Sequence, residues 1–164
     1  MRIRLTWKKA LFSSTYSIYS NEKIVGALTG KYFAQTASGE LNGKKYTFRT
    51  KGILKQETEI FDSRENKVVG RILYGNWMSN ATLELPDKSV SWAYDNLWNT
   101  KWHVVDAEGT KIKYGGTSTS GEIESNTDDA LLLLSGLFVT NYFWQMAIGI
   151  MIVAFLPIWI SVLS

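Results

Sequence analysis

A chain of 164 residues is expected to form one domain, and a composition that is 45% hydrophobic and 20% charged excludes a disordered protein. The absence of cysteine excludes disulfides, thiolate metal sites and cysteine nucleophiles, and a single histidine leaves a transition-metal site short of ligands. The net charge of +3 is unevenly spread, because residues 1–71 carry 14 Lys/Arg and 6 Asp/Glu whereas residues 72–164 carry 4 and 9. A basic first half attracts anionic partners such as lipid head groups or nucleic acid, and it equally fits an ordinary solvated surface.

The first residues of the chain are basic but do not form a signal sequence. The segment MRIRLTWKKALFSSTYS has no apolar run after its cations, which a secretory signal would require. The folded part of the protein is therefore expected on the cytoplasmic side of any membrane.

From residue 2 to residue 125 the sequence has the pattern of short strands. Runs rich in Thr, Tyr, Ile, Val, Phe and Trp alternate with clusters of Gly, Asn, Asp and Ser, and the connections have the length of hairpin turns. No amphipathic helical pattern interrupts them. The predicted strands lie near residues 2–7, 11–20, 23–29, 31–36, 44–50, 52–62, 67–75, 80–86, 89–95, 101–106, 110–115 and 120–125.

Three of these hairpins share one pattern. Residues 15–28 (TYSIYSNEKIVGAL), 57–73 (ETEIFDSRENKVVGRIL) and 100–116 (TKWHVVDAEGTKIKYGG) each contain an alternating strand, a polar turn and a lysine-containing strand that runs into glycine. Repeated hairpins are typical of meander sheets, and closing such a sheet removes the exposed edges that would otherwise aggregate. The sequence therefore predicts a closed antiparallel β-barrel.

Alternation along residues 44–55 predicts which side chains point inward. Tyr46, Phe48 and Leu54 fall on even positions and are expected inside, while cations on odd positions are expected outside. No acidic residue occurs in residues 41–56. We call the cations of this stretch the basic strand patch and regard them as a candidate site for anionic lipid: Lys44, Lys45, Arg49, Lys51 and Lys55. The same residues also fit a solubilising barrel exterior.

A second stretch predicts an aromatic inner face. Val90, Trp92 and Tyr94 share one face of their strand, and Trp102 and Val104 continue it on the next. A face this apolar must be covered by other apolar residues.

The chain ends in 35 residues without a charge, Ala130–Ser164. The first part, about 128–146, begins with acidic residues, which a helix N-terminus favours, and Thr127 or Asp128 is predicted to cap it. This helix is apolar on all sides rather than striped, so it must be buried either in lipid or in protein. At 1.5 Å per residue, about 20 residues span roughly 30 Å, which suits a bilayer and also the bore of a barrel.

The twelve short strands, the repeated Tyr-x-Ile and Lys-Ile-Val-Gly hairpins, and the lone apolar helix after the last strand resemble the tubby C-terminal superfamily. This group includes tubby-like proteins, phospholipid scramblases and LURP-one-related proteins. The resemblance implies that residues 1–146 form a twelve-stranded barrel closed around a central hydrophobic helix, which would cover the aromatic inner face. In tubby-like proteins a basic surface patch binds phosphoinositides, which implies anionic lipid for the basic strand patch.

Such a barrel leaves residues 147–164 without an apolar partner, and three interpretations stay open. The segment continues out of the barrel as a membrane anchor, or it packs on the barrel exterior or at a homo-oligomer interface. In the third interpretation the whole tail crosses a membrane, and the barrel is filled by its own side chains.

No Ser-His-Asp arrangement, carboxylate pair or Gly-rich phosphate loop is found, so the sequence predicts a non-enzymatic protein without a cofactor. The leading hypothesis is a membrane-associated module that contacts anionic phospholipid and is held by residues 147–163. No nucleic-acid partner is expected. The alternatives are a soluble structural or scaffold barrel with its tail buried in a homo-oligomer, and a carrier of a hydrophobic ligand in a hollow barrel.

Overall fold

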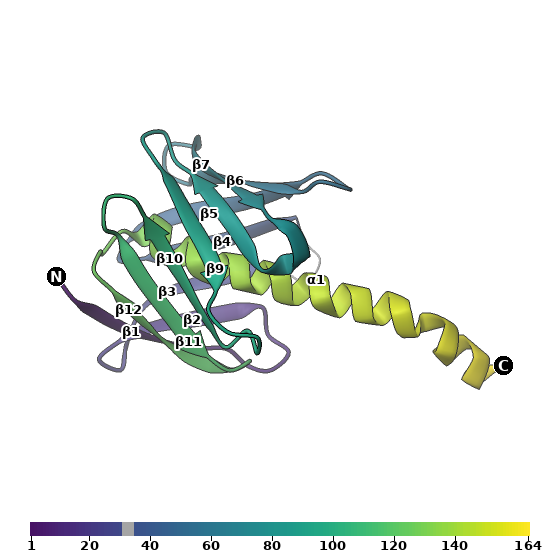
Figure 1. Ribbon diagram of the computed structural model, residues 1–164. Coiled ribbons are helices and arrows are strands. Elements are labelled where there is room, and N and C mark those ends of the chain that lie inside the picture. The colour runs from purple at the N-terminus through teal and green to yellow at the C-terminus, as the bar shows by residue number, and fades with distance from the viewer. Residues whose placement is uncertain (31–34) are drawn as a thin grey trace.

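The computed structural model describes residues 1–30 and 35–164, and within them it shows a closed antiparallel β-barrel followed by one long helix (Figure 1). The strands follow one another around the barrel in chain order, and the first closes it by pairing with the last. The twelve strands of the described residues are β1 (Ile3–Lys8), β2 (Thr15–Ser20), β3 (Lys23–Gly30), β4 (Thr36–Leu41), β5 (Lys44–Lys51), β6 (Glu57–Asp62), β7 (Lys67–Tyr74), β8 (Asn80–Glu84), β9 (Ser89–Tyr94), β10 (Lys101–Asp106), β11 (Lys111–Gly116) and β12 (Ser120–Ser125). A short 3-10 turn, η1 (Asn76–Met78), precedes β8, and the helix is α1 (Ala130–Leu163).

The predicted fold class is confirmed: the chain forms a closed antiparallel β-barrel of twelve strands around a hydrophobic helix. The inner part of α1 occupies the bore, and every residue from Ala130 to Thr140 is buried. Trp92 and Val104 on the predicted aromatic face are fully buried against it. The interpretation in which the whole tail crosses a membrane and the barrel fills itself is therefore wrong.

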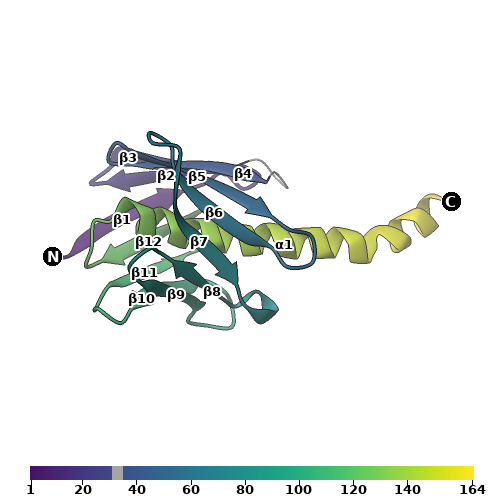
Figure 2. The same ribbon diagram turned by 90° about the horizontal axis from the view of Figure 1, so that it is seen from above.

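Helix α1 enters the barrel at one end and leaves it at the other, which distinguishes the two ends (Figure 2). Because neighbouring strands are antiparallel, successive connections lie at alternate ends. Residues 126–129 lead into α1 at one end, here called the capped end, and α1 leaves at the other, here called the exit end (Figure 2). The turns at the capped end are 21–22, 42–43, 63–66, 85–88, 107–110 and 126–129. The exit-end loops that the structure describes in full are 9–14, 52–56, 75–79, 95–100 and 117–119.

Helix α1 begins two residues later than predicted and is continuous. Its N-cap is Asp129, whose carboxylate accepts hydrogen bonds from the backbone N–H groups of Leu131 (2.9 Å) and Leu132 (3.4 Å). The predicted cap, Thr127 or Asp128, is therefore wrong. No break occurs near residue 146, so the core helix and the apolar tail form a single rod, which bends over its last turns, where Pro157 lacks a backbone N–H (Figure 1).

The fourth strand lies later in the chain than predicted. Residues 31–34 of the predicted strand 31–36 lie outside the described residues, and β4 begins at Thr36. Its sequence, TASGEL, lacks the bulky β-branched residues that mark strands. One reason is the helix: a Cβ added to Gly39 would lie 3.2 Å from a methyl group of Leu134. Small residues here let α1 pass close to the wall.

Two strand starts are also wrong, because residues 11–14 and 52–56 form loops rather than strand. Gly52 turns the chain out of β5 with a φ of +100°, which favours glycine. Leu54, predicted to point inward, is fully exposed in this loop. Phe48 does point inward, and its ring stacks on that of Phe138 in α1 at a centroid distance of 4.5 Å.

Candidate functional site

The barrel wall holds α1 through polar contacts as well as apolar packing. The indole N–H groups of Trp92 and Trp102, on adjacent strands, both donate to the carbonyl oxygen of Gly136 at 3.0 Å. A buried indole needs such an acceptor, and on one face of a helix carbonyl groups recur only about once per 5.4 Å turn. The paired contacts therefore define the register of the helix in the bore.

A tyrosine on β11 makes a second polar contact with α1, one helical turn before Gly136. The hydroxyl of Tyr114 lies 3.0 Å from the carbonyl oxygen of Leu133 and 3.3 Å from that of Leu132, to which it donates. Burial raises the pKa of the Tyr114 phenol well above its usual range, so the group stays protonated and remains a donor. Further along α1, the hydroxyls of Tyr94 and Thr140 lie 2.9 Å apart and share a hydrogen bond.

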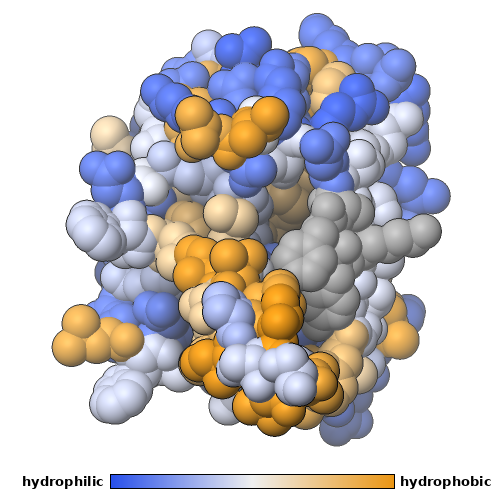
Figure 3. Space-filling model, turned by 90° about the vertical axis from the view of Figure 1, so that its right-hand side faces the viewer, coloured by the Kyte–Doolittle hydropathy of each residue, from blue (hydrophilic) through white to orange (hydrophobic). Residues whose placement is uncertain are grey.

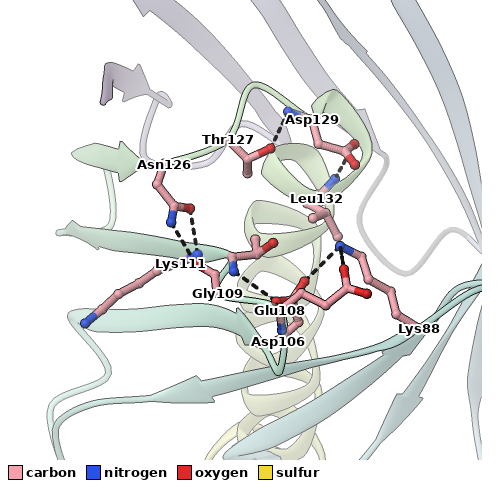
Figure 4. A network of polar contacts seen from close by, with 10 residues as sticks. Lys88, Asp106, Glu108, Gly109, Lys111, Asn126, Thr127, Asp129 and Leu132 are labelled. Atoms are coloured by element: carbon pink, nitrogen blue, oxygen red, sulfur yellow. Dashed lines mark hydrogen bonds and ion pairs between the residues drawn. The ribbon is translucent and has the colours of Figure 1, made fainter. Parts of the chain in front are cut away.

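At the capped end a polar network holds the segment that enters the barrel (Figure 4). The Asn126 side chain donates to the carbonyl of Gly109 and accepts from the backbone N–H of Lys111, both at 2.7 Å. The hydroxyl of Thr127 accepts from the N–H of Asp129 at 3.2 Å. These bonds tie the start of α1 to the β10–β11 turn.

A partly buried ion pair joins the β8–β9 turn to the end of β10 and the turn that follows it. Lys88 Nζ lies 2.8 Å from a carboxylate oxygen of Asp106 and 3.6 Å from one of Glu108. The other oxygen of Asp106 accepts from the backbone N–H groups of Glu108 and Thr110, each at 2.9 Å. The hydrogen bond from Lys88 holds the pKa of Asp106 well below its usual range, and the same bond raises the pKa of Lys88.

At the exit end a buried cation lies beside the departing helix. The Lys9 side chain is 8% exposed, its Nζ donates to the carbonyl of Ser13 at 3.1 Å, and it lies 5.4 Å from the ring centroid of Trp144. Burial lowers the pKa of Lys9. On another side of the helix, the ring of Tyr142 stacks on that of Tyr74 at 3.9 Å and its hydroxyl donates to Gln56.

Beyond these contacts the helix continues away from the barrel. We call Trp144–Leu163 the outer helix: from Ile150 onward every residue is exposed, and no charged residue occurs in it. Its 20 residues extend about 30 Å at 1.5 Å per residue, the thickness of a bilayer's hydrocarbon layer. Within the described residues, α1 is the one helix long and apolar enough to cross a membrane.

The basic strand patch is spread along the full length of the barrel. Lys44 and Lys45 lie at the capped end, whereas Lys51 lies at the exit end and Lys55 in an exit-end loop. Seven residues of strand separate Lys44 from Lys51, about 23 Å at 3.3 Å per residue. The structure therefore does not gather the five cations at one end.

Three of these cations have partners on neighbouring strands. Lys45 lies 3.9 Å from Glu40, and Lys51 lies 3.3 Å from Glu57 and 2.5 Å from Glu59. The guanidinium of Arg49 lies 4.8 Å from the ring centroid of Phe61. Sequence reasoning missed these pairs because the acids lie just outside the acid-free stretch and reach its cations only through strand pairing. Aligning the hairpins in register would have found them.

Two grooves flank α1 where it leaves the barrel. One, of about 600 Å³, lies between Thr36 and Thr50 on the wall and Ile150 on the helix. The other, of about 440 Å³, lies between Trp98 on an exit-end loop and Met151 on the helix. Both open at the exit end, while the bore itself is filled by α1.

Comparison with known protein families, curated sequences and solved structures finds no match for this chain. Nothing in these comparisons links it to the tubby-like superfamily, and that resemblance stays a prediction based on strand count, hairpins and helix position.

Proposed function

We propose that this protein is a non-enzymatic membrane-anchored module in which the outer helix crosses the bilayer and the barrel stands at its surface. The observation that carries the proposal is the exposure of the outer helix, in contrast to the buried first turns of the same helix. In water this rod would leave an apolar surface far larger than soluble monomers tolerate. In a bilayer the same surface is favourably buried.

The outer helix also satisfies the hydrogen-bonding demands of a bilayer. A helix pairs its backbone groups internally, which lipid cannot do for them. The hydroxyl of Ser161 donates to the carbonyl of Ile158 at 2.7 Å, and that of Ser164 to the carbonyl of Ser161 at 3.1 Å. Trp159 lies in the last turns of the outer helix, so it would reach the far edge of the hydrocarbon layer, where tryptophan is enriched.

The second part of the proposal is contact with anionic lipid, and the cations at the exit end are the ones proposed to make it. Attraction between exposed charges fades beyond the Debye length of about 8 Å at physiological salt. Lys44 and Lys45, some 20 Å further from the outer helix, are then too distant to contribute. Lys55, with Lys51 already paired, is the member of the basic strand patch best placed to meet lipid phosphate.

Two alternatives address the same surface. A homo-oligomer would cover the outer helix with a second copy, and a ligand carrier would use one of the grooves beside α1, since a ligand in the bore would have to displace the helix. Neither explains why the exposed part of the helix is uncharged along its whole length.

The test is extraction of the full-length protein from cell membranes. The wild type is expected to stay in the pellet after an alkaline carbonate wash and to require detergent for release. Ile152→Arg/Phe155→Arg puts two charges at the middle of the span, each costing about 3 kcal/mol there, and is expected to release the protein from the membrane. Ile152→Leu/Phe155→Leu is the matched control and should behave as wild type. A wild-type protein recovered without detergent as a soluble oligomer would refute the anchor.

A further inference from the structure

We propose that the loops around the exit end form an apolar rim that sits in the head-group layer of a bilayer. The inference rests on the proposed function, because the outer helix that leaves through this rim brings the bilayer to it. The rim consists of Leu11, Phe12, Ile53, Leu54, Trp77, Leu97 and Trp98.

These side chains come from four separate loops and are presented to solvent. Their exposed fractions run from 50% for Leu11 to 102% for Leu54, and Trp77 and Trp98 are 94% and 85% exposed. Figure 3 looks onto this face, with the end of α1 toward the viewer and separate hydrophobic patches toward the edges of the barrel. Apolar side chains scattered singly on a surface need no explanation, but seven around one opening mark a contact surface.

The rest of the barrel surface that the structure describes lacks such a cluster. Outside α1 and the rim, the large apolar side chains exposed in the described residues are Met1, Ile24 and Val68. All three lie toward the capped end, and none lies in a turn between strands. Among the described residues, large exposed apolar side chains in loops are therefore confined to the end from which the helix leaves.

Backbone conformation adds an independent observation at η1. Trp77 has a φ of +62° and Met78 a φ of +52°, in the left-handed region that bulky side chains rarely adopt. Met78 packs against the core, whereas Trp77 is 94% exposed. Hairpin turns with two left-handed residues favour Asn and Gly, so neither the turn nor packing within the chain accounts for an exposed tryptophan here, whereas contact with lipid would.

Charge separates the two ends in the same direction. The capped-end turns carry six acids and two cations: Glu22, Glu65, Asp87, Glu108, Asp128, Asp129, Arg64 and Lys88. The exit-end loops described in full carry Lys9, Lys55 and Asp95. Cytoplasmic membrane surfaces are negative, so the excess of acids in the capped-end turns disfavours contact of those turns with lipid, and the exit-end loops carry no such excess.

Lipid fits the rim better than a protein partner does. From Ile150 the exposed helix projects about 20 Å past the rim, so any partner lying flat on the rim must also surround this helix. A bilayer does both, since tryptophan settles at the head-group level while the apolar helix enters the hydrocarbon. A second copy facing the rim would carry its own projecting helix into the same space.

The experiment uses the absence of cysteine to place one fluorophore at a time on the full-length chain. Leu97→Cys lies in a rim loop and Ala107→Cys in a capped-end turn, and β10 joins the two sites. Ile53→Cys and Glu65→Cys form a second matched pair joined by β6. All four side chains are exposed, so labelling disturbs no packing. Each labelled protein is reconstituted into phosphatidylcholine vesicles that contain a head-group nitroxide lipid, and co-flotation is measured on the same samples.

The rim labels are expected to shift to shorter emission wavelength and to lose emission to the nitroxide lipid, while the capped-end labels keep the emission they show in water. If the protein floats with the vesicles but all four labels show the emission of a label in water, the proposed contact of the rim with lipid is refuted, whereas the membrane anchor is supported. If the rim labels leave water without nitroxide quenching, protein covers the rim and the lipid proposal is overturned. If the protein does not float, the proposed function fails and the rim fails with it.

Discussion

The hydroxyl of Tyr114 occupies the space that a side chain on Gly136 would need. A Cβ built on Gly136 lies 2.1 Å from this oxygen, far inside van der Waals contact. The same hydroxyl bonds to carbonyls in the preceding turn of α1, so it has little freedom to move away. Glycine at this position lets the barrel wall approach the helix backbone closely.

Gly136→Ala is therefore expected to destabilise the barrel although alanine favours helix. The propensity gain is about 1 kcal/mol, and overpacking a filled core costs about 1–3 kcal/mol, more once the hydrogen bonds of Tyr114 are lost. We expect a net loss of about 1–2 kcal/mol in the free energy of unfolding, measured by denaturant titration in detergent micelles. Gly149→Ala is the matched control, because Gly149 lies in the same helix beside an open groove. Equal stability of the two variants would contradict this account.

The two indoles that share the carbonyl of Gly136 give a second prediction. Trp102→Phe removes one donor and part of a ring that stacks on Tyr114 at 5.5 Å. The expected cost is about 2 kcal/mol, roughly half from the hydrogen bond and half from lost apolar contact. Trp92→Phe should cost a similar amount. A double-mutant cycle measures their coupling, and no effect of either single variant would show that the indoles do not hold the helix.

Stability should fall in acid because of Asp106. Its pKa in the folded protein lies below the ordinary value of 3.8, mainly through the hydrogen bond from Lys88. A depressed pKa contributes stability that is fully present above the unfolded value and is lost as pH falls toward the folded value. The free energy of unfolding should thus decline below about pH 4. In Asp106→Asn that decline should be smaller, and the variant should be about 2 kcal/mol less stable near neutral pH. A wild-type stability that falls below pH 4 with the same slope as that of the variant would exclude this role.

The two ends of the basic strand patch should differ in their effect on lipid binding. Lys55→Glu is expected to weaken binding of the full-length protein to vesicles that contain anionic lipid, by up to about 2 kcal/mol for a charge reversal at the surface. Lys44→Glu is the matched control at the capped end and should change binding little. Equal effects of the two variants would show that the whole strand, not the exit end, faces lipid.

Sequence pattern was enough to predict the barrel, because hairpin repeats and strand alternation are local. The sequence pattern also predicted a buried apolar helix, because a helix without a polar face must avoid water. It failed at β4, where Gly39 serves a close approach to Leu134 that no local pattern shows. It also placed Leu54 inward, because alternation says nothing about where a strand ends.

The candidate sites were harder to predict for a topological reason. The acids that pair with Lys45 and Lys51 are adjacent only once β4, β5 and β6 are in register. The apolar rim was missed because its loops, 9–14, 52–56, 75–79 and 95–100, are far apart in the sequence. Only the antiparallel arrangement of the closed barrel brings them together at one end. A search for exposed aromatics in alternate connections would have found it.

If α1 passes through the barrel and then crosses a bilayer, the barrel and the end of the helix lie on opposite sides of the membrane. Labelling one cysteine on each side tests this most directly. Ser164→Cys and Glu65→Cys, each the single cysteine of a full-length chain, are placed in sealed membrane vesicles of uniform orientation and treated with a membrane-impermeant maleimide. The account predicts that only one of the two reacts until detergent opens the vesicles, because the barrel and the end of the helix lie on opposite sides. Equal reaction of both cysteines in sealed vesicles would contradict it.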